Sequence, residues 1–376
     1  MPSMHLALPR SRRLRYGAPA LVAVVALGAG PFVNAVTADA HGSLPPRTAA
    51  QLLVDVQKAR ITGVSGTVVE TTDLGLPAIP SIGGAGGGSA EFSSLVSGSH
   101  TMRVWYAGPD RVRLALLGQL GESDLLRHGS DVWAWSSHTN TATHWTVPAD
   151  ATAGPGQGLA GEGPAAAAMT PQQAAAAVLE AIGPTTQVST DSTAEVAGRP
   201  AYQLELVPRD SRSLVGSVRI AIDGSSHIPT RVQVFARGAT HPAFQVGFTS
   251  FSTQTPADSV FGFTPPPGAT VKQGTTGPEG HQARHHASGG AAPRVVGKGW
   301  TSVLVAQLPA DIVPGTKSGS GGATAALLKS LPRVSGSWGS GTLLRSALFS
   351  VVLTDDGRVA IGAVPPSVLY DALSRA

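Results

Sequence analysis

Apolar and polar residues alternate along most of residues 64–251, in short runs separated by turn residues. In residues 111–117, Val112, Leu114 and Leu116 fall on one side of an extended chain, while Arg111 and Arg113 fall on the other. A period of two residues is typical of a β-strand with one buried face. Strands are predicted at residues 66–72, 100–106, 111–117, 124–127, 132–136, 143–147, 188–196, 201–207, 216–223, 231–236 and 244–251. Short strands at this spacing favour an antiparallel sheet or barrel.

Two capping boxes interrupt the strands and predict two helices. Thr48 and Gln51 begin the first helix, at residues 48–60, and Thr170 and Gln173 begin the second, at residues 170–182. In a capping box the two side chains each satisfy a backbone N–H group that the first helical turn leaves free. The chain therefore has helices to pack against the sheet.

A polar, glycine-rich segment at residues 269–293 follows the strands and is predicted to be a flexible linker. Beyond it we expect a strand within residues 300–307, a helix near 324–331, a hairpin closed by residues 355–358 and a short last helix at 366–373. The predicted organisation is a main domain at residues 41–268 and a small C-terminal α+β module at residues 294–376.

Residues 1–40 read as an export signal. A basic start ends at Arg15, an apolar run covers residues 18–33, and Ala38-Asp39-Ala40 matches a cleavage site. An uncleaved membrane anchor is the alternative interpretation, and either one predicts that the rest of the chain is extracytoplasmic, secreted or held at the outer face of the membrane. Of the net charge of +4, this leader contributes +3, so no basic face for nucleic acid is indicated.

The sequence indicates no enzyme and no cofactor. With no cysteine, disulfides, thiolate metal sites and a cysteine nucleophile are excluded. The local motifs of serine hydrolases, zinc proteases and P-loop proteins are missing, which leaves a dispersed-triad hydrolase as a remote alternative. His281, His285 and His286 lie in the predicted linker without nearby carboxylates, so we expect a solvated loop there and no metal site.

Several short motifs, in this order and spacing, resemble the LolA/LolB/RseB-like family of periplasmic lipoprotein carriers, in the versions of bacteria without a conventional outer membrane. The resemblance covers about residues 48–271. Its motifs are VSGTV at 64–68, RVWY at 103–106, PDRVR at 109–113, DVW at 131–133, VAGRPAYQL at 196–204, ID at 222–223, IP at 228–229 and FGFTPPPG at 261–268.

The resemblance implies an α+β fold: a strongly curved antiparallel sheet, an unclosed β-barrel, with helices plugging its concave face. It further implies an extracytoplasmic protein that binds and carries lipid or lipoprotein acyl chains. The alternative is an RseB-type regulatory sensor that docks on a membrane-bound anti-sigma factor. The expected partners are acyl chains and a membrane surface. An ABC transporter or an anti-sigma factor is the candidate protein partner. The glycine-rich stretch at residues 83–88 and the C-terminal module depart from the family pattern.

Apolar residues on the predicted strands are the candidate acyl groove, because large apolar pockets between a sheet and helices bind ligands. The alternative is that they form an ordinary core. Arg103, Arg111 and Arg113 are either contacts for lipid headgroups or the solvent face of two strands. The candidate groove residues are Trp105, Leu114, Leu116, Trp133, Trp135, Phe235, Val246 and Phe248.

Overall fold

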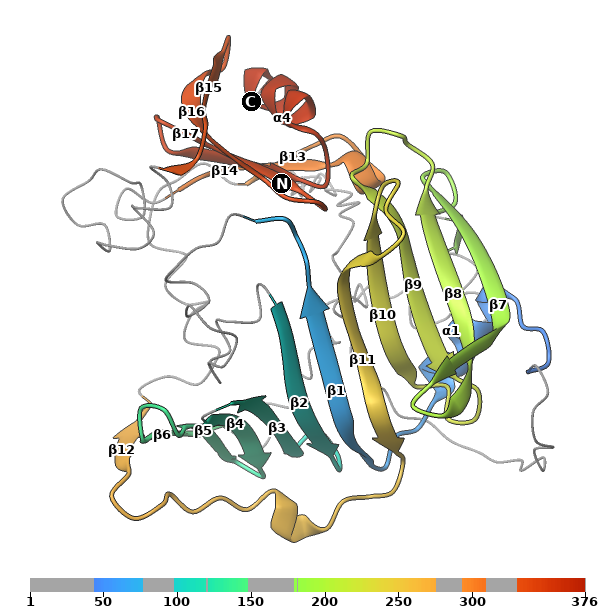
Figure 1. Ribbon diagram of the computed structural model, residues 1–376, viewed down its shortest axis with the longest axis vertical. Coiled ribbons are helices and arrows are strands. Elements are labelled where there is room, and N and C mark those ends of the chain that lie inside the picture. Colours follow the sequence, from blue (N-terminus) through green and yellow to red (C-terminus); the bar gives the residue numbers. More distant parts are fainter. Residues whose placement is uncertain are drawn as a thin grey trace, which may run out of the picture.

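The computed structural model describes residues 44–76, 98–119, 121–147, 179–180, 182–274, 293–308 and 330–375, and two β-sheets dominate it (Figure 1). The larger sheet has twelve strands in the order β12-β6-β5-β4-β3-β2-β1-β11-β10-β9-β8-β7. Its strands are β1 (Val64–Thr72), β2 (Gly98–Tyr106), β3 (Arg111–Gly118), β4 (Gly121–His128), β5 (Asp131–Ser136), β6 (Thr141–Thr146), β7 (Thr186–Val196), β8 (Arg199–Pro208), β9 (Val215–Asp223), β10 (Pro229–Ala236), β11 (Pro242–Ser252) and β12 (Thr270–Gln273).

The large sheet is curved and open. Its neighbouring strands are antiparallel except β12, which pairs parallel with β6. Figure 1 shows the strands β3 to β6 turned away from the plane of β7 to β11. The edge strands β12 and β7 do not pair with each other, so the sheet does not close into a barrel.

Helix α1 (Ala49–Lys58) lies against one face of this sheet. The predicted capping box is present: the Gln51 amide donates to the Thr48 hydroxyl, and the Thr48 amide donates to the Gln51 side chain. Leu52 on its inner side is fully buried and packs with Tyr202, Leu204 and Ile222 of β8 and β9.

The smaller sheet has six strands in the order β13-β14-β18-β17-β16-β15. Helix α4 (Pro366–Ser374) packs on one of its faces, where Val352, Ala360 and Leu369 are fully buried. The strands are β13 (Arg294–Val296), β14 (Val303–Gln307), β15 (Arg333–Gly336), β16 (Gly339–Arg345), β17 (Ser350–Thr354) and β18 (Arg358–Gly362).

The two sheets share an apolar cluster. Val215 and Ala243 of the large sheet pack with Leu348 of the small module, and all three are buried. Two backbone bonds cross the contact, from the Leu214 amide to the Ala363 carbonyl at 2.8 Å and from the Ala347 amide to the Leu74 carbonyl at 2.8 Å. Burial of several apolar side chains at this contact ties the two sheets together.

The predicted fold class is confirmed as an open, curved, mainly antiparallel sheet with a helix against it and a small α+β module. All eleven strands predicted between residues 66 and 251 are present, as are the first helix, the hairpin at residues 355–358 and the last helix. The structure adds strands at residues 270–273, inside the predicted linker, and at 294–296 and 333–345. The predicted helices at 170–182 and 324–331 lie mainly outside the described residues.

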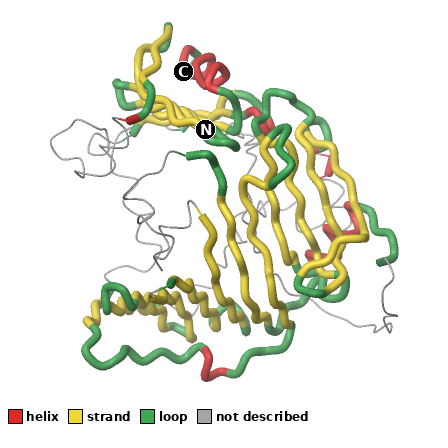
Figure 2. The backbone as a smooth tube through the Cα atoms, in the orientation of Figure 1, coloured by secondary structure: helices red, strands yellow, loops and turns green. Residues whose placement is uncertain are grey.

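Strands greatly outnumber helices in the described chain, as the colours in Figure 2 show. Of the helices in this part of the protein, none is long and apolar enough to cross a membrane.

Candidate functional site

The face of the large sheet that carries α1 is apolar across seven strands; we call it the helix-bearing face. Residues that pair directly across strands share a face of the pleated sheet. From the α1 contact the pairs run from Leu204 to Ile220 and on through Val232 to Val246. The face continues into a buried cluster on the next strands, formed by Val68, Met102 and Leu116, with Val104, Leu114, Val246 and Phe248 packed against it.

Leu125 of β4 extends this face to the solvent. It pairs with Leu114 and is 44% exposed, whereas Leu116 two residues away from Leu114 is fully buried. Within the described residues, α1 packs over β8 and β9, and the apolar cluster on this face of β1 to β3 includes no helix residue. The helix-bearing face therefore presents an apolar surface that runs from the core to the outside.

One buried acid interrupts the apolar surface. Glu70 is only 4% exposed and pairs across strands with Val246 on one side and His100 on the other. The His100 ring nitrogen Nδ1 lies 2.9 Å from Oε2 of Glu70, and the Thr72 hydroxyl donates to Oε1. Because an unpaired buried charge is costly, this pairing is what allows a carboxylate among apolar side chains.

Four of the eight predicted groove residues lie on the helix-bearing face. They are Leu114, Leu116, Val246 and Phe248. The register places the other four on the opposite face: Trp105 pairs with Arg113, Arg113 with Leu126 and Leu126 with Trp133. The eight residues therefore do not share one surface, because alternation along a strand does not tell which face a neighbouring strand will match.

The tryptophans of the opposite face have their own packing partners. Trp133 stacks on His144 with ring centroids 4.3 Å apart, and Phe263 lies 5.3 Å from Trp133 and 6.0 Å from Trp135. The Arg103 and Arg113 guanidinium groups lie 5.7 and 5.3 Å from the centre of the Trp105 ring. These distances fit aromatic stacking and cation–π contact.

Phe235 is likewise covered by an arginine on the opposite face. The Arg219 guanidinium lies 4.6 Å from its ring centre, and the Arg219 Nε donates to Glu205 at 2.8 Å. Phe235 is 8% exposed. A network of charged and aromatic side chains thus covers this side of β8 to β10.

Two of the three arginines predicted either as headgroup contacts or as a solvent face, Arg111 and Arg113, make ion pairs. Arg113 bonds to Asp124 at 2.8 Å and to Glu122 at 3.3 Å, while Arg111 lies 3.4 Å from Asp258. The hydrogen bond between Glu122 and Asp124, together with burial, raises the pKa of Glu122 despite the nearby Arg113. These residues form a network of ion pairs on the opposite face of β3 and β4, in which the buried Nε of Arg111 has no hydrogen-bond partner among the described residues.

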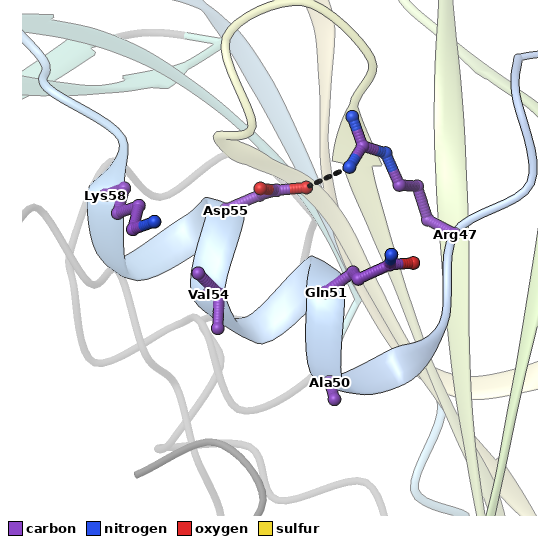
Figure 3. Close-up of a pocket in the computed structure, with 6 residues that line it drawn as sticks. All are labelled: Arg47, Ala50, Gln51, Val54, Asp55 and Lys58. Atoms are coloured by element: carbon purple, nitrogen blue, oxygen red, sulfur yellow. Dashed lines mark ion pairs between the residues drawn. The ribbon is translucent and has the colours of Figure 1, made fainter. Parts of the chain in front are cut away.

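A pocket of about 220 Å³ is lined by α1 and the segment before it (Figure 3). Asp55 and Lys58 of the helix and Arg47 before it supply charges. Arg47 Nη1 lies 3.7 Å from Asp55 Oδ2. Ala50, Gln51 and Val54 complete the described lining. Nothing in the sequence pattern predicted this pocket, since charged residues such as Asp55 and Lys58 are ordinary on a solvent-exposed helix face.

The described part of the chain has no group of three or more histidine, aspartate or glutamate side chains placed to hold a metal ion. His281, His285 and His286 lie outside it.

The fold and its apolar face define the class: an open, curved-sheet protein with a small α+β module packed against the end of its large sheet. No protein-family model matches the chain, and no curated protein matches its sequence.

Solved structures that are similar to this chain include MucB in its complex with MucA from Pseudomonas aeruginosa, at 15% identity and a TM-score of 0.40, covering 86% of this chain and 96% of that one. A LolA superfamily protein from Nitrosomonas europaea is similar at 13% identity and a TM-score of 0.21, covering 58% and 99%. An uncharacterised conserved protein from Thermus thermophilus is similar at 11% identity and a TM-score of 0.33, covering 61% and 100%. Likenesses this distant assign no ligand to the chain.

Proposed function

We propose that this protein binds acyl chains of a lipid or lipoprotein on the helix-bearing face, outside the cytoplasmic membrane. The single observation that carries the proposal is the apolar surface that runs from buried Leu116, through Leu114, to exposed Leu125. An alkyl chain gains about 0.8 kcal/mol for each CH₂ group that it buries. A surface open at one end lets such a chain enter without unfolding the sheet.

The structure also offers a matched pair of substitutions to test it. Leu125 is 44% exposed on the helix-bearing face, and Val271 of β12 is 49% exposed. Val271 pairs with Ala142, which pairs with Trp135, so it lies on the opposite face. Both side chains are exposed enough for a charge to be tolerated.

The experiment measures binding of a fluorescent fatty acid and of an acylated peptide to the full mature chain. We expect Leu125→Glu to weaken binding about tenfold or more, because a carboxylate would have to be buried against the alkyl chain. Val271→Glu should bind as the unchanged protein does. Equal loss in both variants, or no binding and no copurified lipid in the unchanged protein, rejects acyl binding.

A second candidate function has its own observation. On the face of the small sheet opposite α4, Val295 pairs with Leu304 and Leu304 with Ile361, and these side chains are 36%, 40% and 38% exposed. Exposed apolar rows of this kind often contact other proteins. This row supports a regulatory role in which the small module docks on the extracytoplasmic part of a membrane-bound anti-sigma factor.

Copurification separates the two functions. If the chain is a regulator, Ile361→Asp should abolish capture of an anti-sigma factor encoded beside it, and Leu125→Glu should not. If it is a carrier, an ABC transporter gene is expected in the neighbourhood instead, and lipid identified by mass spectrometry should accompany the purified protein.

A further inference from the structure

Asp55 is held beside an arginine and a histidine but hydrogen-bonds to neither. Its Oδ2 atom is buried and lies 3.7 Å from Arg47 Nη1 and 3.9 Å from His227 Nε2. Hydrogen bonds of this type have donor–acceptor distances of about 2.7–3.2 Å. Among the described residues Oδ2 has no hydrogen-bond partner, and leaving a buried acceptor in that state is unfavourable.

The groups around Asp55 are fixed by their own contacts. The Arg47 carbonyl accepts a hydrogen bond from the Thr190 hydroxyl at 2.9 Å, which ties the segment before α1 to β7. His227 stands in the turn between β9 and β10 with a φ of 56°, a left-handed conformation that is uncommon for residues other than glycine, although histidine adopts it more often than most. Strained conformations of this kind persist where the surrounding structure enforces them and are frequent at functional sites.

The same turn is pinned by a neighbouring carboxylate. Asp223 accepts hydrogen bonds from the Ser226 amide at 2.7 Å and from Arg199 Nε at 2.6 Å. The His227 amide in turn donates to the Asp223 carbonyl at 2.9 Å. His227 is therefore positioned against Asp55 by a rigid turn.

Lys58 supplies a second positive charge to the pocket, next to Asp55. It is exposed, lines the pocket, and follows Asp55 by three residues on α1. Side chains three residues apart on a helix lie about 5–6 Å from each other on the same surface. Figure 3 shows Lys58, Asp55 and Arg47 in sequence along the pocket, with the acid between the two cations.

We propose that this pocket binds a phosphate ester whose alcohol carries a primary ammonium group two carbons away, as in phosphoethanolamine. The phosphate oxygens would accept hydrogen bonds from Lys58, and the ammonium would donate to the Asp55 carboxylate. The short two-carbon spacer matches the separation of one helical turn between Lys58 and Asp55. The pocket volume of about 220 Å³ is below the range of drug-sized sites and suits a headgroup.

The chemistry is shared by a lipid headgroup and by a soluble phosphate ester, and the experiment separates them. Calorimetric titration of the full mature chain uses four probes: glycerophosphoethanolamine, dihexanoyl phosphatidylethanolamine, glycerophosphoglycerol and inorganic phosphate. We expect both ethanolamine probes to bind at least fivefold more tightly than the other two. Equal affinity for the two ethanolamine probes identifies the headgroup alone as the ligand, and tighter binding of the dihexanoyl form identifies a lipid.

Substitutions assign the two ends of the ligand. Lys58→Gln should weaken both ethanolamine probes about tenfold, while Lys272→Gln, which removes the same charge from exposed β12, should leave them unchanged. Asp55→Asn should remove the preference for ethanolamine over glycerol. The thermal midpoint of each variant shows that the fold is intact.

Three results would overturn the assignment. They are no binding of either ethanolamine probe, equal binding of inorganic phosphate, and an unchanged preference in Asp55→Asn. Because glycerophosphoethanolamine has no acyl chain, its binding is independent of the proposed acyl site, and either proposal can fail while the other stands.

Discussion

The most unusual residue of the large sheet is Glu70, a carboxylate in the middle of the apolar helix-bearing face. Its two oxygens accept from His100 and Thr72, and its neighbours across the sheet include Val246. Removing one partner of a buried pair leaves the other charge or donor without compensation, whereas removing both does not.

This asymmetry makes a prediction at the residue scale. Glu70→Leu alone should lower the free energy of unfolding by about 2–4 kcal/mol, since it removes the buried carboxylate to which His100 and Thr72 are hydrogen-bonded. The double variant with His100→Leu should lose less than the sum of the two single variants. Urea unfolding of the four proteins measures the coupling, and strictly additive losses would show that the pair is not a unit.

At the scale of elements, the small sheet is pinned at one edge by an exposed ion pair. Arg333 of β15 donates two hydrogen bonds, at 2.7 and 2.6 Å, to Asp355 in the turn between β17 and β18. The guanidinium of Arg333 and the Ser340 hydroxyl lower the pKa of Asp355 to about 2. This ion pair links the hairpin of β15 and β16, at the edge of the small sheet, to the turn at residues 355–358 that the sequence predicted.

The direction of the pH effect follows from this shift. An aspartate whose pKa is lower in the folded than in the unfolded chain adds stability above about pH 4, and this stability is lost as the pH falls towards 2. Both side chains are about half exposed, so solvent screening limits the effect to about 1 kcal/mol or less.

The measurement is the free energy of unfolding between pH 5 and pH 2. Asp355→Asn should be less stable than the unchanged protein at pH 5 and similar to it near pH 2. Asp371→Asn is the control, since Asp371 on α4 is exposed and forms no ion pair within the described chain. A constant difference across the pH range would show that the pair's charge does not contribute.

At the scale of the whole molecule, the apolar cluster of Val215, Ala243 and Leu348 joins the two sheets. The Trp300 indole also donates to the Thr186 hydroxyl at 2.8 Å, which adds a polar link between the module and β7. The segment at residues 269–293, predicted to be a linker, contains β12 at its start, so that cleavage is expected only after residue 274.

Limited proteolysis tests this organisation. A single cut within residues 275–292 should leave two fragments that elute together, because burying the shared cluster holds them. Leu348→Ala should weaken that association and cost about 2–5 kcal/mol of stability through the cavity it leaves. Fragments that separate at once after cleavage of the unchanged protein would show that the contact between the sheets is too weak to matter.

Export is a second prediction for the whole molecule. The basic start, apolar run and Ala38-Asp39-Ala40 sequence at residues 1–40 predict that the rest of the chain lies outside the cytoplasm. Alkaline phosphatase fused after residue 274 should be active in cells with the leader and inactive when residues 1–40 are deleted. An inactive fusion with the leader present would reject an extracytoplasmic location.

Local pattern determined the elements of this protein. The two-residue period located eleven strands, and the Thr48 and Gln51 capping box located α1, because both signals act between residues close in the sequence. The same period puts Trp133 and Trp135 on one side of β5, and in the structure both rings lie near Phe263. The resemblance carried by the order of short motifs also predicted the open, curved sheet.

Only the tertiary structure decided which side of each strand faces α1. That depends on cross-strand register, which moved four of the eight predicted groove residues to the opposite face. It also decided the parallel pairing of β12 with β6, for which the exposed residues 270–273 carry no apolar period. The pocket of Arg47, Asp55 and Lys58 beside His227 exists because a turn some 170 residues along the chain returns to the first helix. Contacts between distant segments leave no trace in local sequence, and the candidate sites of this protein are built from such contacts.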